Sequence, residues 1–303
     1  MTITARLSRI TLGLTLILIG IGGFTRGSGS GYGCADRWPL CDGGTLGGLL
    51  PRWEYHMIIE WLHRWTAAVV GLLALSTLIY TYRTHRQQKN IIRLAASAVT
   101  VIIIQALLGR SVVKTDLDSD LVALHLAVSM IVIALLTILS VRTSPTQNTV
   151  NPIAKYSNWT KRIGLAAFGS YFLLLLGAYS HNRYFSGWPL MQGSLLPGLS
   201  DQYKIAHWLH RLGAGIGLIY LVQLISIAHK VKRPNNERNL LYLSIGAYSI
   251  NMALGGVHVL TKVESSAVVT AHLVGATLVW TFLVAATALS RTQIAISPSR
   301  IRQ

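Results

Sequence analysis

The chain alternates between long apolar segments and short polar connections. Eight segments are continuously apolar over the roughly 17–25 residues that a helix needs to cross a bilayer: 7–25, 58–82, 91–113, 119–142, 160–181, 203–229, 239–260 and 266–290. Transmembrane strands would alternate apolar and polar residues, and these segments do not. The pattern predicts an all-α polytopic membrane protein with eight transmembrane helices in a lipid bilayer.

Composition and charge agree with this prediction. Hydrophobic residues make up 51% of the 303 residues, charged residues only 12%, and the mean hydropathy is +0.47. The net charge of +17 would suit nucleic-acid binding, but most of the 27 basic residues fall on the side that holds both termini, where only Glu237 opposes them. Cytoplasmic loops carry such an excess. We therefore expect a cell-membrane protein with both termini in the cytoplasm, and no nucleic-acid partner.

Four histidines repeat with a fixed spacing. They form two pairs, each 62 residues apart and offset from one another by 147 residues: His63 with His125, and His210 with His272. The first histidine of each pair lies in a similar pentapeptide, EWLHR at 60–64 and HWLHR at 207–211. The repeat predicts two pseudo-symmetric four-helix bundles, 1–145 and 155–303, in the same orientation across the membrane.

The histidines of this repeat are candidate haem ligands. All four helices that carry them run from outside to inside, and at 1.5 Å per residue the imidazoles lie roughly 6–9 Å below the outer surface. Two parallel helices can then present two neutral imidazoles to one iron from opposite faces. The simpler alternative is that the histidines form hydrogen bonds between helices. Zinc binding is less favoured, because the sequence has no local Cys/His cluster to ligate it. The repeated spacing and matched depth favour haem, held by His63 with His125 and by His210 with His272.

Charged neighbours distinguish the two pairs. Arg64 and Arg211 directly follow the first ligand of each pair, where they could meet haem propionates or extend to the membrane interface. Glu60 lies three residues before His63, on the same helix face. Its counterpart is His207, so the two halves are expected to have different roles. The alternative for Glu60 is a water-exposed carboxylate at the interface.

Both cysteines, Cys34 and Cys41, fall in the first outer loop, about 26–57. Disulfides persist on that side of the membrane. A bridge between them could brace the loop over Glu60 or exchange with a thiol partner. The second half has Tyr184 and Met191 at the aligned positions, so no second bridge is expected there.

Taken together, these motifs resemble the haem A synthase family over essentially the whole chain. The residues that carry the resemblance are Gly27-Ser28-Gly29 with Gly33-Cys34, Trp38-Pro39-Leu40-Cys41, Glu60 to Arg64, His125, His207 to Arg211 and His272. The resemblance implies eight helices in two halves and the conversion of haem O to haem A for terminal oxidases, by oxidation of the C8 methyl of the porphyrin to a formyl group.

The same resemblance implies roles for individual residues. The substrate haem would lie between His63 and His125, and a haem b between His210 and His272. Glu60 would be the catalytic carboxylate, and Cys34 with Cys41 the first-loop cysteine pair. Many bacterial relatives also have a fifth-loop pair, which this chain lacks. Haem O synthase and an electron donor or acceptor are the expected partners, and a homo-oligomer is left open.

A non-enzymatic dihaem b-type electron-transfer cytochrome, or a haem carrier, is the alternative function. Matched histidine pairs would suit either one equally well. All four histidines lie at one depth, however, so the haems would not form a stack across the bilayer. The carboxylate of Glu60 occurs in only one half. This asymmetry also favours an enzyme over an electron-transfer protein or a haem carrier.

Overall fold

The computed structural model describes residues 2–144, 158–180, 185–196, 198, 200–262 and 264–295, with only the backbone for the last four residues. Most of the linker between the expected halves, including their boundaries at 145 and 155, lies outside this part of the chain, as does Tyr184. The described residues form eight long α-helices: α1 (Ile3–Gly27), α2 (Tyr55–Thr84), α3 (Lys89–Lys114), α4 (Ser119–Thr143), α5 (Trp159–Ser180), α6 (Gln202–Lys230), α7 (Asn235–Leu260) and α8 (Ser266–Ala295).

The all-helical membrane fold is confirmed. Each of the eight helices is long and apolar enough to cross a membrane, and the described ranges contain no strand. Each expected apolar segment coincides with one of these helices over nearly all of its length. Several helices extend a few residues further than expected, because polar residues at their ends continue the helix.

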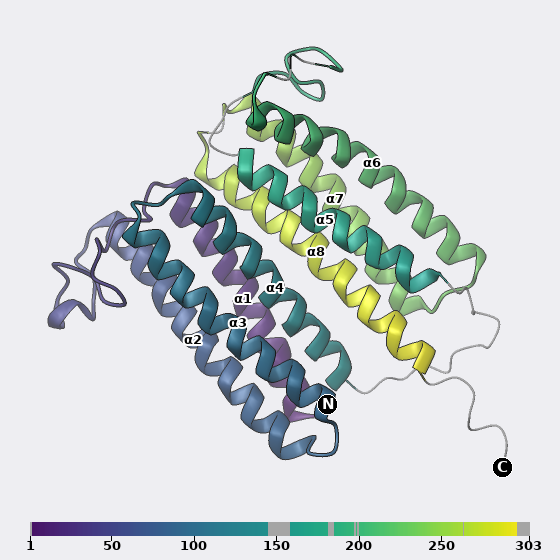
Figure 1. Cartoon of the computed structure of the whole chain (residues 1–303), viewed down its shortest axis with the longest axis horizontal. Helices are drawn as coiled ribbons and strands as arrows, with labels where there is room; N and C mark the ends of the chain where they lie inside the picture. The colour runs from purple at the N-terminus through teal and green to yellow at the C-terminus, as the bar shows by residue number, and fades with distance from the viewer. Residues whose placement is uncertain are drawn as a thin grey trace.

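The helices pack in the same order within each half of the chain. In the first half α1 contacts α2 and α4, while α3 contacts α2 and α4; α5 to α8 repeat these contacts. Figure 1 shows α1–α4 on one side and α5–α8 on the other, with the start of α1 and the end of α8 at the same end of the helices. The two sides meet where α8 packs against α1 and α4, and α4 against α5.

Side-chain hydroxyls contribute to this packing. Threonines within the apolar helices bond to the carbonyl one turn earlier, as Thr11 does to Leu7 at 2.9 Å, which satisfies the hydroxyl where water is absent. Between helices, Thr11 lies 3.3 Å from Thr77 of α2. Across the two halves, Trp280 Nε1 donates to the Met130 carbonyl at 2.9 Å. Small and hydroxyl-bearing residues let membrane helices approach closely, which is how these contacts form.

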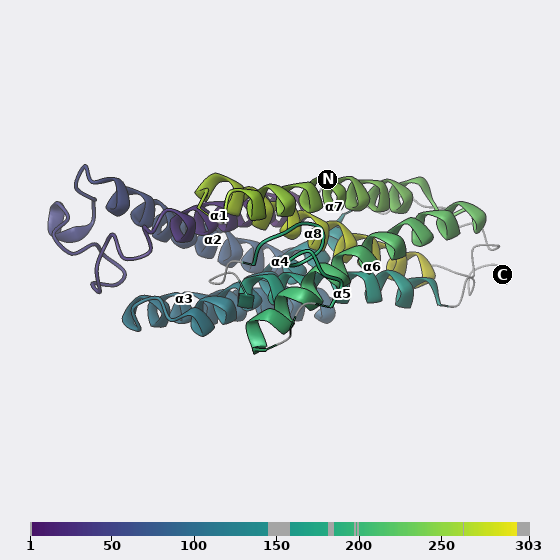
Figure 2. The same ribbon diagram turned by 90° about the horizontal axis from the view of Figure 1, so that it is seen from above.

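The connection between α1 and α2 is the longest described loop. It contains a short 3₁₀ helix, Leu46–Gly48, and the Cys34–Cys41 disulfide. Figure 2 shows this connection projecting beyond the ends of the helices. The connection between α5 and α6, described from Phe185, leaves the same end of the molecule (Figure 1).

Candidate functional site

A single large cavity brings the predicted site residues together. Its volume is about 1060 Å³, and residues from both halves of the chain line it. The lining includes all four candidate ligands, together with Glu60, Arg64 and Arg211. The sequence predicted these residues but not that one continuous cavity would join them.

Each candidate ligand packs against a glycine on the helix that precedes its own. A Cβ built on Gly22 of α1 would come within 2.9 Å of His63 Cε1, and one on Gly109 of α3 within 3.1 Å of His125 Cε1. The second half repeats the arrangement. The pairs there are Gly177 with His210 and Gly255 with His272, at 3.0 and 3.2 Å. These four glycines make room for the imidazoles, and a side chain at any of them would push the ring away.

The two histidines of the second half are oriented by hydrogen bonds. His210 Nδ1 donates to the Leu173 carbonyl at 2.8 Å, and His272 Nδ1 donates to the Asn251 carbonyl at 3.0 Å. A neutral imidazole with its proton on Nδ1 carries its lone pair on Nε2, the nitrogen that can ligate a metal. The ring centroids lie 6.4 Å apart, close to the roughly 6 Å needed when two imidazoles bind one metal ion at about 2 Å each. This pair fits a haem.

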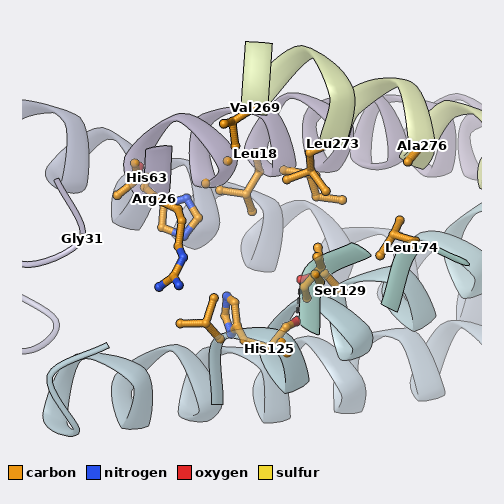
Figure 3. A pocket seen from close by; sticks show the side chains of 18 of the residues that line it. Leu18, Arg26, Gly31, His63, His125, Ser129, Leu174, Val269, Leu273 and Ala276 are labelled. Carbon is orange, nitrogen blue, oxygen red and sulfur yellow. Dashed lines mark hydrogen bonds between the residues drawn. The ribbon is translucent and has the colours of Figure 1, made fainter. Parts of the chain in front are cut away.

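The two histidines of the first half lack such bonds. Among the described residues, the buried Nδ1 atoms of His63 and His125 have no hydrogen-bond partner. Their rings pack against Gly22 and Gly109. They face one another across the cavity (Figure 3). The first pair also fits a haem, but with less rigidly held ligands than the second.

Glu60 is buried next to the first pair. Its side chain is 3% exposed, and both carboxylate oxygens are engaged. Oε1 accepts from Arg64 Nε at 3.0 Å and Nη2 at 2.5 Å, while Oε2 accepts from the Cys34 amide at 2.7 Å. Glu60 therefore faces the protein interior rather than bulk water. Its counterpart His207 also lines the cavity, 6.4 Å from the ring of His210 between centroids.

Arg64 holds the disulfide loop. Its Nη1 donates to the carbonyls of Arg37 and Leu40 at 3.0 and 2.7 Å. Its Nη2 donates to the Ala35 carbonyl at 3.3 Å, in addition to Glu60. With Nε on Glu60, all five guanidinium N–H groups have acceptors within the protein.

Arg211 makes similar contacts in the second half. Its Nη2 donates to the Phe185 carbonyl at 2.9 Å, and its Nη1 donates to the Gly187 carbonyl. Each arginine thus fastens the loop that precedes its own helix. The Arg64 side chain is 9% exposed and bonds the protein rather than extending to the interface. Contact of Arg64 or Arg211 with haem propionates stays a prediction.

The disulfide is confirmed and belongs to this network. Cys34 and Cys41 are bonded and fully buried. Their loop is closed by backbone bonds from Cys41 to Gly48 and from Asp42 to Cys34, at 2.9 and 3.0 Å. Because the Cys34 amide also bonds Glu60, the loop and the carboxylate are positioned together.

Sequence reasoning missed two features of the cavity. The first feature is the contact of four glycines with the imidazoles, because the spacing of these glycines did not predict it. Arg26, at the end of α1, lines the cavity and reaches toward the space between His63 and His125 (Figure 3). His56 of α2 contacts the first loop, where its Nδ1 lies 2.9 Å from Ser30 Oγ.

Comparison with known proteins identifies the family. The family model described as cytochrome oxidase assembly protein matches residues 5–284. The haem A synthase of Shouchella clausii is 33% identical over 244 residues, which cover 78% of this chain and 79% of that protein. The haem A synthase of Symbiobacterium thermophilum is 27% identical over 249 residues, covering 77% of this chain and 78% of the relative. The chain therefore belongs to the haem A synthase family of cytochrome oxidase assembly proteins.

Proposed function

We propose that this protein is a membrane haem A synthase, which oxidises the C8 methyl of haem O to a formyl group and so supplies haem A to terminal oxidases. The observation that carries the proposal is the cavity itself. It is lined by two matched histidine pairs, and a buried carboxylate lies beside only one of them. The names of the relatives support the same activity.

In this proposal the two histidine pairs hold different haems. His63 and His125 would bind the substrate, haem O, and release haem A. His210 and His272 would keep a haem b. The hydrogen bonds on the second pair support this division, because a ligand oriented by a backbone carbonyl is held more firmly. Bound haem supplies an iron that changes oxidation state and, at the first site, the methyl group to be oxidised.

Glu60 would act at the substrate methyl. Arg64 and the Cys34 amide hold its two oxygens in place, so the carboxylate cannot rotate freely. From that position it would take a proton from the methyl carbon or stabilise positive charge that develops there. His207 cannot supply a fixed negative charge at the corresponding place in the second half. The chemistry is therefore assigned to the first half.

The orientation in the membrane belongs to the same proposal. Both termini would be cytoplasmic in the cell membrane, because the basic residues are concentrated at that end. The disulfide loop and the histidine ends of the cavity would then face outward. Haem O synthase would deliver the substrate, and a redox partner would remove electrons.

The experiment is to produce the chain together with haem O synthase and to extract and identify the haems by chromatography and mass. The proposal expects new haem A or its hydroxylated intermediate, and neither with Glu60→Gln, although that variant retains its haems. Haem O and haem b alone, from a folded and haem-loaded protein, would instead indicate a dihaem cytochrome or a haem carrier.

A further inference from the structure

We propose that Arg26 binds a carboxylate substituent of the porphyrin held between His63 and His125, and so determines how that porphyrin is rotated in the cavity. The inference rests on the proposed function, because it takes a porphyrin as the ligand of the first pair. It assigns to Arg26 the role that the sequence suggested for Arg64.

The position of Arg26 on α1 places it beside the first histidine. Gly22, which contacts the His63 ring, precedes Arg26 by four residues. Residues four apart lie on the same face of a helix. Arg26 therefore sits one turn beyond the His63 contact, toward the outer end of the cavity that it lines. Figure 3 shows its side chain extending into the space between the two imidazoles.

Two further arginines of the cavity bind loops. Among the described lining residues there are three arginines and no lysine. Arg64 donates all its N–H groups to Glu60 and to backbone carbonyls of the first loop. Arg211 fastens the loop of the other half. Arg26 also lines the cavity, and its side chain extends between the candidate ligands of the first half (Figure 3).

The charges that line the first half favour an anionic ligand. Glu60 is the acidic residue among the described lining residues, and Arg64 neutralises it through an ion pair in which Nε and Nη2 both donate to Oε1. Arg26 adds a further positive charge in a cavity wall made largely of apolar side chains such as Leu18 and Leu117. A carboxylate on the ligand would neutralise that charge and form charge-assisted hydrogen bonds with the guanidinium.

Rotation of the porphyrin is the property that this contact would control. Ligation by two histidines fixes the iron but leaves the ring free to turn about the axis that joins them. The carboxylates of a porphyrin lie on one edge of the ring, so an ion pair with Arg26 would fix that edge at the outer end of the cavity. The same contact would decide which peripheral methyl group faces Glu60. Arg26 is therefore a positioning residue.

The test compares iron protoporphyrin with its dimethyl ester, whose carboxylates carry no charge. Purified full-length protein, with its resident haem, is titrated with each probe, and binding is followed by the Soret absorbance change that His63→Ala abolishes. Arg26→Gln should weaken binding of the free acid about 10-fold or more, as expected for a lost charge-assisted hydrogen bond. It should weaken binding of the ester less than about 3-fold, and Arg26→Lys should retain part of the difference.

Lys114→Gln is the matched control. Lys114 lies at the same end of the molecule, pairs with Asp36 at 3.5 Å and is absent from the cavity lining. Its loss changes the net charge by the same amount and should leave both affinities unchanged. A retained spectrum of the haem held by His210 and His272 shows that each variant is folded.

Two outcomes would overturn the inference. Equal weakening of both probes by Arg26→Gln would mean that Arg26 only supports the fold, and no effect on either would mean that it does not meet the ligand. The proposed function fails separately. If wild-type protein binds the free acid more tightly than the Arg26→Gln variant does, but makes no haem A with haem O synthase, the carboxylate contact is supported and the enzymatic function is refuted.

Discussion

Replacing Gly22 by alanine tests whether the histidine–glycine contacts set the ligand geometry. The added Cβ would lie 2.9 Å from His63 Cε1, whereas two carbon atoms prefer about 3.5–4.0 Å. The imidazole would therefore have to move by roughly 0.6 Å or more from its position beside α1. Overpacking of this kind costs about 1–3 kcal/mol, which corresponds to about a 5- to 150-fold loss in the ligation equilibrium.

The assay uses three variants on α1 and α5, each produced with haem O synthase. Gly22→Ala should lower the haem A yield at least about fivefold and keep the low-spin spectrum of the second haem. Gly177→Ala, whose Cβ would lie 3.0 Å from His210 Cε1, should weaken that spectrum. Gly13→Ala is the control, because its Cβ meets nothing within 4 Å and alanine favours the helix by about 1 kcal/mol. If Gly22→Ala behaved like Gly13→Ala, the packing argument would be wrong.

Three further changes test separate parts of the structure. Glu60→Ala should retain haem but make no haem A, since the carboxylate is lost while the four ligands remain; a normal haem A yield would exclude its role. His272→Ala should remove the low-spin haem b spectrum, and an unchanged spectrum would show that His272 is not the ligand. Glu237→Gln should cost about 3–5 kcal/mol of stability, read as a lower Tm, because buried Arg233 loses its 2.6 Å ion pair. The single amide oxygen of glutamine cannot replace both carboxylate oxygens, which accept from Arg233 and Trp159. Exposed Glu54→Gln should leave Tm unchanged, and equal effects of the two would contradict the burial argument.

The eight membrane spans could be predicted from the sequence because hydropathy is a local property. In the absence of water only helices and closed barrels satisfy the backbone, and a continuously apolar run of bilayer length does not have the alternating pattern of a barrel strand. The ends were less predictable. The segment expected at 58–82 extends over Tyr55–Thr84 in the structure, since polar residues at the membrane surface can continue a helix with little cost.

The histidine pairs were also predictable, because an internal repeat preserves spacing and helical periodicity converts spacing into depth. The tertiary structure decided what surrounds them. Apart from Glu60, the acceptors of Arg64 are backbone carbonyls 24 to 29 residues away, and a carbonyl has no sequence signature. The difference between the pairs likewise depends on whether Leu173 and Asn251 carbonyls lie beside an imidazole.

The sequence by itself therefore determined the class of fold, the number of spans and the candidate ligands, each of which depends on residues close together in the chain or on the repeat. Only the tertiary structure decided that Gly22 accommodates His63, that Arg64 fastens the first loop and that Arg26 reaches the cavity. Contacts of this kind depend on how helices approach one another. That approach is set by the packing of all eight helices together, and no short segment of sequence specifies it.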